Sequence, residues 1–191
     1  MFYEKKVLDK ILMDEKDLYL ENNEKSMRKK RHNRYMIWKY LRCFRLFQYY
    51  YFKRKVENKR FLRYKWKILC RFYEKKKNII GQKVGIEIGA NCNIGKNLDI
   101  WHSGVVINAD IGNECTFHGN NILGNKGKGR ENETPVVGDG VDFGAGAVAI
   151  GRVEIAKGCK IGANAVVTKS IKEPNSIVVG IPGVVIKSKR G

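Results

Sequence analysis

The feature that most constrains the fold is an apolar residue that returns every six positions in the second half of the chain. It occupies Ile88, Ile94, Ile100 and Val106, after one slip Ile111, Phe117 and Leu123, and after an interruption Val137, Phe143, Ala149, Ile155, Ile161 and Val167. A period of six fits neither a helix, with about 3.6 residues per turn, nor a long strand, with a period of two. The repeat therefore demands short units that stack on one another.

A second column and a set of corner residues complete each six-residue unit. Four positions after the first column come mostly small or apolar residues, which we also expect to point inward: Cys92, Leu98, Gly104, Cys115, Asn121, Val141, Ala147, Val153, Cys159 and Ala165. Between the columns stand residue types that tolerate the left-handed backbone of a tight corner: Asn91, Asn97, Asn120, Gly140, Gly146, Gly158 and Asn164. Three such units make a triangular turn of about 18 residues. The pattern predicts a mainly β fold, a left-handed parallel β-helix of about four to five coils.

Charge divides the chain into two regions. Of the net +19, residues 1–86 carry 26 Lys and Arg against 9 Asp and Glu, whereas residues 87–191 carry 12 against 10. Such an asymmetry indicates parts with different roles, one of them electrostatic. We predict a basic, aromatic-rich helical region at 1–83, the β-helix at 84–187 with a protruding polar loop at 124–135, and a tail at 188–191.

The cysteines and the amino-terminal residues limit the classes of protein to which the chain can belong. The five cysteines form no CxxC pair and no ligand spacing with the three histidines. The sequence therefore predicts no metal site and, with an odd count, no disulfide framework. Charged residues interrupt every apolar run near the amino terminus, which argues against a signal peptide or a membrane-spanning helix and favours a cytoplasmic location.

Several stretches of the second half resemble a known family. They are "IGKNLDIWHSGVVIN", "LGNKGKG" followed by "TPVVGDGV", "IGANAVVTKSI" and "VVGIPGVVIK". Residues 85–187 resemble the hexapeptide-repeat acyltransferases, in particular serine O-acetyltransferases and the O-acetyltransferases of capsule and exopolysaccharide biosynthesis. The resemblance implies acetyl-coenzyme A as co-substrate, no permanently bound cofactor, and a homotrimer with sites between subunits.

His102 is the candidate general base. It follows Ile100 by two residues and precedes Ser103 and Gly104, the place where members of the family carry their base. An imidazole with an ordinary pKa near 6.5 can take a proton from an alcohol as its oxygen attacks a thioester. Glu87 stands where serine acetyltransferases carry an aspartate that orients the base, and Asp99 is the second choice for that role. The alternative reading of His102 is a polar residue on a solvent face.

Other residues are assigned to the two substrates. His118, Asp99 and Trp101 are predicted to bind the acceptor, although His118 also fits a structural role. The resemblance assigns coenzyme A to Gly127 and Lys128 of the loop and to small residues of the later coils, namely Gly144, Ala145, Gly162, Ala163, Gly180 and Pro182. The alternatives are a flexible solvated loop and simple closure of the β-helix.

The loop also bears on the acceptor. Serine acetyltransferases carry Arg-His before the closing proline of this loop, whereas this chain carries Glu133 and Thr134 before Pro135. A glutamate there would repel the carboxylate of serine. We therefore expect a sugar hydroxyl in cell-surface polysaccharide biosynthesis as acceptor, with serine O-acetyltransferase as the first alternative. A non-catalytic β-helix scaffold with a polyanion-binding arm is the second.

The basic region has its own alternatives. Residues 25–77 carry 21 Lys and Arg with Glu57 and Glu74 as the only acids, and contain no proline or glycine. Two or three helices rich in aromatic and basic residues suit an anionic membrane surface, here the inner face of the cell membrane. An oligomerisation cap fits as well. Nucleic acid or another polyanion is less favoured, since no recognised nucleic-acid-binding fold signature is present.

Overall fold

The computed structural model describes residues 4–20 and 28–188, and for residues 28–32, 187 and 188 it describes the backbone alone. The chain forms two compact units, Met1–Gly85 and Ile86–Gly191. The boundary predicted from the sequence, between residues 83 and 84, lies two residues before the one in the structure. Of the predicted tail at 188–191, Ser188 ends the last strand and the other residues lie outside the described ones.

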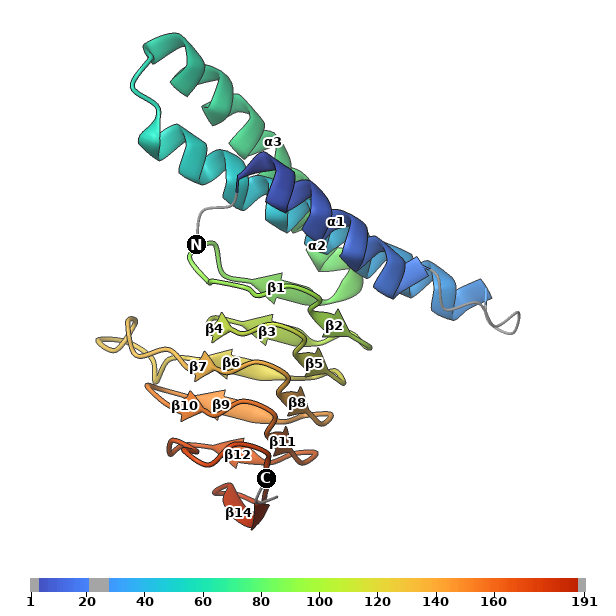
Figure 1. Ribbon diagram of the computed structural model, residues 1–191, viewed down its shortest axis with the longest axis vertical. Helices are drawn as coiled ribbons and strands as arrows, with labels where there is room; N and C mark the ends of the chain where they lie inside the picture. The colour runs from blue at the N-terminus through green and yellow to red at the C-terminus, as the bar shows by residue number, and fades with distance from the viewer. Residues whose placement is uncertain (1–3, 21–27, 189–191) are drawn as a thin grey trace. The chain divides into compact units, whose positions relative to one another are not determined.

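The first unit consists of helices α1 (Lys5–Leu20), α2 (Arg28–Val56) and α3 (Arg60–Val84) (Figure 1). The absence of proline and glycine from 25 to 77 allows α2 and α3 to run long, because these two residues are the strongest helix breakers. Helix α3 ends at Gly85, which adopts the left-handed conformation and donates its N–H to the carbonyl oxygen of Gly81.

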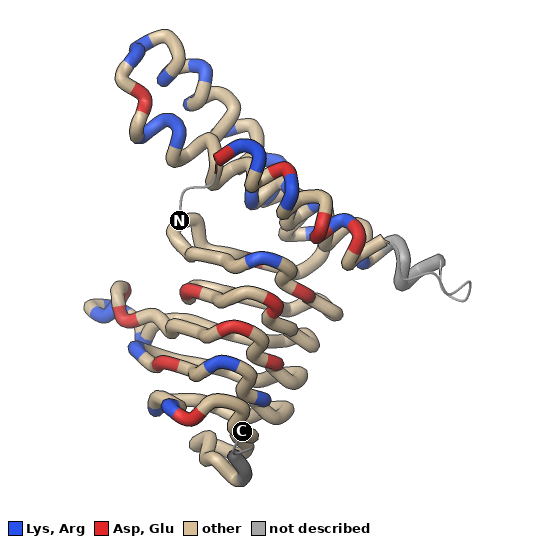
Figure 2. The backbone as a smooth tube through the Cα atoms, in the orientation of Figure 1, with Lys and Arg blue, Asp and Glu red and all other residues tan. Residues whose placement is uncertain are grey.

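Many aromatic side chains of the helical unit are packed between its helices. Tyr40, Phe44 and Phe47 of α2 are at most 2% exposed, and the ring of Tyr50 stacks on Trp66 and on Tyr73 of α3 with centroids 5.7 and 5.5 Å apart. These rings hold the helices together and are not available to a membrane. Basic residues recur along the helices, as the blue segments of Figure 2 show.

One face of α3 remains apolar and exposed. Phe61, Tyr64, Ile68 and Phe72 are exposed by 80, 63, 53 and 55%, and their spacing places them on a single side of the helix. We call these four residues the α3 stripe. No described helix is both long enough and apolar enough to cross a bilayer.

The second unit is a parallel β-helix with three faces, and the predicted left-handed β-helix is confirmed. Sheet A holds β1 (Ile86–Ile88), β3 (Val105–Ile107), β6 (Ile122–Gly124), β9 (Val148–Ile150) and β12 (Val166–Val167). Sheet B holds β4 (Asp110–Ile111), β7 (Val136–Val137) and β10 (Glu154–Ile155). Sheet C holds β2 (Asp99–Ile100), β5 (Thr116–Phe117), β8 (Asp142–Phe143), β11 (Lys160–Ile161), β13 (Ser176–Val179) and β14 (Val184–Ser188). Among the described strands, only β13 and β14 pair antiparallel.

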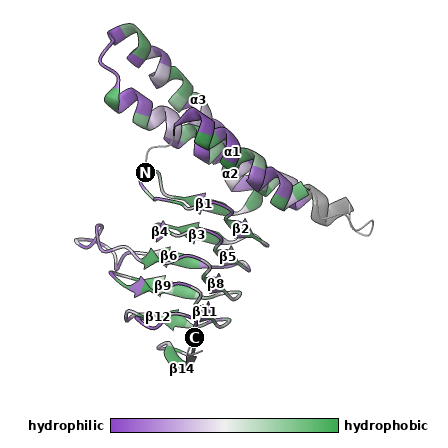
Figure 3. Cartoon of the chain, viewed as in Figure 1, coloured by the Kyte–Doolittle hydropathy of each residue, from purple (hydrophilic) through white to green (hydrophobic). Residues whose placement is uncertain are grey.

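The predicted inward columns are buried with two exceptions. Val106 is 39% exposed, and Ile107 at 1% takes its place; Val105 at 0% replaces Gly104. The cause is one extra residue in the corner between β2 and β3, which reverses the alternation of the following strand. Many strands of the β-helix are green, that is apolar, in Figure 3. In the core, Phe117 and Phe143 of successive coils stack with ring centroids 4.8 Å apart.

The corners use the left-handed backbone as predicted at all but one position. Asn97, Asn120, Asn164 and the three predicted glycines have positive φ. Asn91 does not, and Glu114 and Asn175 adopt this conformation without having been predicted.

The buried cysteines yield a prediction about reactivity. Burial raises the pKa of the Cys115 thiol to about 11, and its Sγ lies 3.3 Å from the carbonyl oxygen of Gly138. Because the thiolate is the reactive form, we expect iodoacetamide at mildly alkaline pH to leave Cys115 of the native protein unmodified. Denatured protein, in which all five free cysteines react, is the control. Rapid native labelling of Cys115, detected by peptide mass analysis, would show that this coil opens.

Candidate active site

His102 lies in the corner where the chain passes from β2 of sheet C to β3 of sheet A. Trp101, His102 and Ser103 are all exposed there. Gly119 of the next coil lies directly against His102: a Cβ on Gly119, whose φ is +120°, would come within 2.7 Å of the His102 Cβ. His102, the candidate base, is therefore packed against a backbone that approaches it more closely than a residue with a Cβ would allow.

This contact predicts that Gly119→Ala displaces His102. We expect kcat/KM for the predicted acetyl transfer to fall by about 10- to 100-fold, because a small displacement of a reacting group has an effect of that size. Gly140→Ala is the matched control, since Gly140 also has positive φ but no atom within 4 Å of the added methyl group. Equal activities of the two variants would show that the position of His102 does not depend on Gly119.

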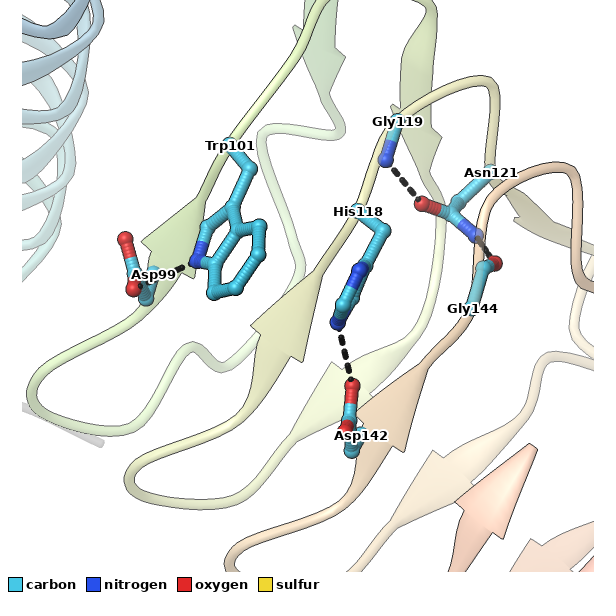
Figure 4. A network of polar contacts seen from close by, with 7 residues as sticks. All are labelled: Asp99, Trp101, His118, Gly119, Asn121, Asp142 and Gly144. Carbon is cyan, nitrogen blue, oxygen red and sulfur yellow. Dashed lines mark hydrogen bonds and ion pairs between the residues drawn. The ribbon is translucent and has the colours of Figure 1, made fainter. Parts of the chain in front are cut away.

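Asn121 connects the coils behind this corner (Figure 4). Its side chain is fully buried, its Oδ1 accepts the N–H of Gly119 at 2.9 Å, and its Nδ2 donates to the carbonyl oxygens of Gly144 at 2.8 Å and Ala147 at 3.2 Å. Both ends of the amide are thus satisfied, as burial requires. Asn121 was assigned only to the inward column; a polar residue among apolar ones was the signal of this second role.

His118 belongs to a cluster of polar and aromatic side chains on sheet C (Figure 4). Its Nε2 lies 2.9 Å from Oδ1 of Asp142 on β8, and its ring packs on that of Trp101 at 4.4 Å with an interplanar angle of 31°. Trp101 Nε1 donates to Oδ2 of Asp99 at 2.8 Å. The three predicted acceptor residues therefore lie together. Asp142 was missed, because the loop predicted at 124–135 separates its coil from that of His118 in the sequence.

The two carboxylates predicted to orient His102 lie on β1 and β2. Glu87 is exposed on β1 opposite Val106 of β3, and Asp99 of β2 accepts the indole N–H of Trp101. The imidazole–carboxylate pair that the structure does contain is the one between His118 and Asp142. The role of Glu87 stays a prediction.

The small residues predicted to meet coenzyme A continue the corner of His102 along later coils. Gly144 packs over Ala163, where a Cβ would come within 2.6 Å of its nitrogen. The N–H of Asn164 bonds to the carbonyl oxygen of Ala145, and that of Val166 bonds to the carbonyl oxygen of Gly180. Gly162 precedes Ala163 in the same corner, and Pro182 is exposed in the turn between β13 and β14. The corners of the later coils, in line with the corner of His102, are thus formed largely by small residues and backbone groups.

Gly127 and Lys128 do not lie at the corner of His102. The loop that contains them connects β6 of sheet A to β7 of sheet B, so it leaves sheet A on the side opposite the His102 corner. The side chain of Asn125 and that of Glu131 accept the N–H groups of Gly127 and Gly129 at 3.0 and 2.9 Å, and the latter bond lowers the pKa of the Glu131 carboxyl. A single chain does not bring this loop to His102.

Glu133 is not an isolated negative charge. Its Oε2 lies 3.9 Å from Nη1 of Arg130, three residues earlier in the loop. The repulsion that we expected toward an acceptor carboxylate is therefore reduced by an adjacent guanidinium.

Comparison with known proteins gives serine acetyltransferases. No family model matches the chain. It is 41% identical over 105 residues to a serine acetyltransferase of Mycobacterium tuberculosis, covering 53% of this chain and 45% of that protein. It is 38% identical over 131 residues to one of Staphylococcus aureus, covering 63% and 61%. The crystal structure of Neisseria gonorrhoeae serine acetyltransferase matches with a TM-score of 0.75 at 22% identity, covering 98% and 69%.

These matches decide between the acceptors predicted from the sequence. The resemblance to hexapeptide-repeat acyltransferases such as the serine acetyltransferases is confirmed. The prediction of a sugar acceptor in polysaccharide biosynthesis is wrong, because the matching relatives are serine acetyltransferases; the first alternative is favoured instead. The chain spans less than two thirds of the length of these curated relatives, at 45% and 61%.

Proposed function

We propose that this protein is an O-acetyltransferase that transfers the acetyl group of acetyl-coenzyme A to the hydroxyl of serine. The observation that supports this most strongly is the exposed His102 in the coil corner, within the segment that resembles serine acetyltransferases. The adjacent edge of small residues can admit the extended arm of coenzyme A without side-chain obstruction.

The proposed reaction is a direct transfer. His102 accepts the hydroxyl proton of serine while the hydroxyl oxygen forms a bond to the thioester carbonyl carbon. The carbon–sulfur bond then breaks, and the imidazolium returns the proton to the departing thiolate. The products are O-acetylserine and free coenzyme A, and no covalent enzyme intermediate or permanently bound cofactor is required.

The separation of the loop from the His102 corner supports a site shared between copies of the chain. Lys128 is exposed and suits a phosphate-rich ligand as a mobile positive charge. In a homotrimer, the loop of one chain could lie beside the His102 corner of the next. We therefore propose that the active site is complete only in the oligomer.

The test is acetyl transfer by the purified protein. Release of free thiol from acetyl-coenzyme A is measured with and without L-serine, and the product is identified by mass. We expect thiol release that depends on serine and exceeds the rate with glucose at equal concentration. Thiol release that does not increase with serine would contradict the proposed acceptor.

For the helical unit we propose a second role, attachment to an anionic membrane surface. The α3 stripe supplies exposed rings, and Arg60, Lys65, Arg71 and Lys76 lie beside it on the same helix. Rings at headgroup depth and flanking basic residues, each worth roughly 1 kcal/mol near a charged surface, act together in such attachment.

Vesicle flotation with the full-length protein tests this role. We expect binding to vesicles with anionic lipid that weakens as salt rises, because salt screens the basic residues. Phe61→Ala with Phe72→Ala should reduce the binding that persists at high salt. Ile122→Ala with Val136→Ala, at exposed apolar positions of the β-helix, is the matched control. Equal binding by the two double variants, or none by the wild type, would contradict attachment through the α3 stripe.

A further inference from the structure

The proposed acceptor carries a group for which the active site needs a partner. Serine has a carboxylate two carbon atoms from its hydroxyl, so the side chains that bind the two groups must be neighbours. A carboxylate is bound best by a charged donor. The loop position before Pro135 offers Glu133 and Thr134, and neither is a cation.

His118 lies in the right place to supply that donor. Its neighbour in sequence, Gly119, is the residue that lies against His102, so the two imidazoles come from adjacent coils of the same corner. The His118 side chain is 32% exposed and therefore open to a ligand. Its packing against Trp101 at 4.4 Å fixes the plane of the ring.

Asp142 determines which nitrogen remains for a ligand. Its Oδ1 is buried, accepts no hydrogen bond among the described residues, and lies 2.9 Å from His118 Nε2. Nε2 therefore faces a negative charge, and Nδ1 is the nitrogen not engaged by Asp142. In the protonated ring both nitrogens carry a hydrogen, so the ring can face Asp142 with one and donate to a ligand with the other.

We infer that His118, positioned by Asp142 and Trp101, binds the carboxylate of the amino-acid acceptor through Nδ1. The inference rests on the proposed serine acetyltransferase function and assigns a specificity-determining residue to it. Asp142 and Trp101 are positioning residues, since they act through the imidazole. His102 keeps the role of base.

The experiment compares L-serine with ethanolamine, which has the same hydroxyl and amine but no carboxylate. In the wild type we expect kcat/KM to favour serine. His118→Gln replaces the imidazole by a hydrogen-bonding side chain that cannot become positively charged. It should raise KM for serine by about 10- to 100-fold, the usual effect of losing a charged hydrogen bond, and raise KM for ethanolamine by a clearly smaller factor.

Three further variants separate this role from a structural one. Asp142→Asn should lower the preference for serine in the same direction but by less, and His118→Arg should retain more of it than His118→Gln because the cation is kept. Lys160→Gln is the matched control: Lys160 is an exposed cation on β11, paired with Asp142 of β8 in the same sheet, and its loss should leave the preference intact.

The outcomes distinguish this inference from the proposed function. A wild type that does not acetylate serine overturns the function itself. A wild type that prefers serine, with a His118→Gln variant that loses activity equally on serine and ethanolamine, overturns the carboxylate role alone. Selective loss in Lys160→Gln would assign the carboxylate to that lysine instead.

Discussion

Replacement of His102 by alanine is expected to lower kcat for acetyl transfer by about 10²- to 10⁴-fold, the usual contribution of general acid–base catalysis. The hydroxyl of serine is a poor nucleophile until its proton is removed, and within the described residues of this corner His102 is the exposed group best suited to remove it. KM should change little, because the proton transfer takes place in the transition state and not in the binding of the ground state.

The folded structure should survive this substitution, since the His102 side chain is exposed and has no hydrogen bond or ion pair among the described residues. Lys157→Ala, an exposed corner position in a later coil, is the control for a surface truncation. Circular dichroism checks folding, and steady-state thiol release measures the rate. Turnover within a few-fold of wild type would remove His102 from the mechanism.

The β-helix could be predicted from the sequence because its repeat is local. Each six-residue unit carries its own inward residue and corner residue, so the alternation survives without knowledge of distant contacts. The error at Val106 shows the limit. A single added residue near His102 moves the buried position to Ile107, and the sequence offers apolar residues at both positions.

The site could be predicted only in part, for a related reason. His102, His118 and Trp101, which the structure brings together, could be proposed from the sequence because they lie close together along the chain. Asp142 lies beyond the loop at 124–135, so its register with His118 depends on the pairing between β5 and β8. Whether Glu87 reaches His102 depends on side-chain geometry, which a spacing of fifteen residues does not determine.

The acceptor prediction failed because one charge was read without its neighbours. Glu133 alone would oppose a carboxylate, but Arg130 lies beside it, and we infer a donor from His118 on another face. Specificity is set by the sum of such groups around a ligand. The loop sequence contains both Glu133 and Arg130, but their proximity is seen only in the structure.

A second large effect is expected in the helical unit, where Arg45→Met should lower the free energy of unfolding by about 3 to 5 kcal/mol. Arg45 Nη2 lies 2.6 Å from Glu15 Oε1, and the two side chains are each 1% exposed. This ion pair joins α1 to α2 within an apolar core. Removing the cation leaves the Glu15 carboxylate buried without its counter-charge, and its Oε2 already has no hydrogen-bond partner among the described residues.

The double variant Glu15→Leu with Arg45→Met tests whether the loss of stability arises from the buried Glu15 carboxylate that has lost its counter-charge. Replacing both partners by apolar side chains should recover most of the stability, because the desolvation cost of both charges disappears together. Arg42→Met, an exposed position three residues earlier on α2, is the matched control and should change stability by less than about 1 kcal/mol. Urea unfolding followed by the helical circular dichroism signal measures all three. A double variant as unstable as Arg45→Met alone would mean that Arg45 contributes through packing of its side chain and not through its charge.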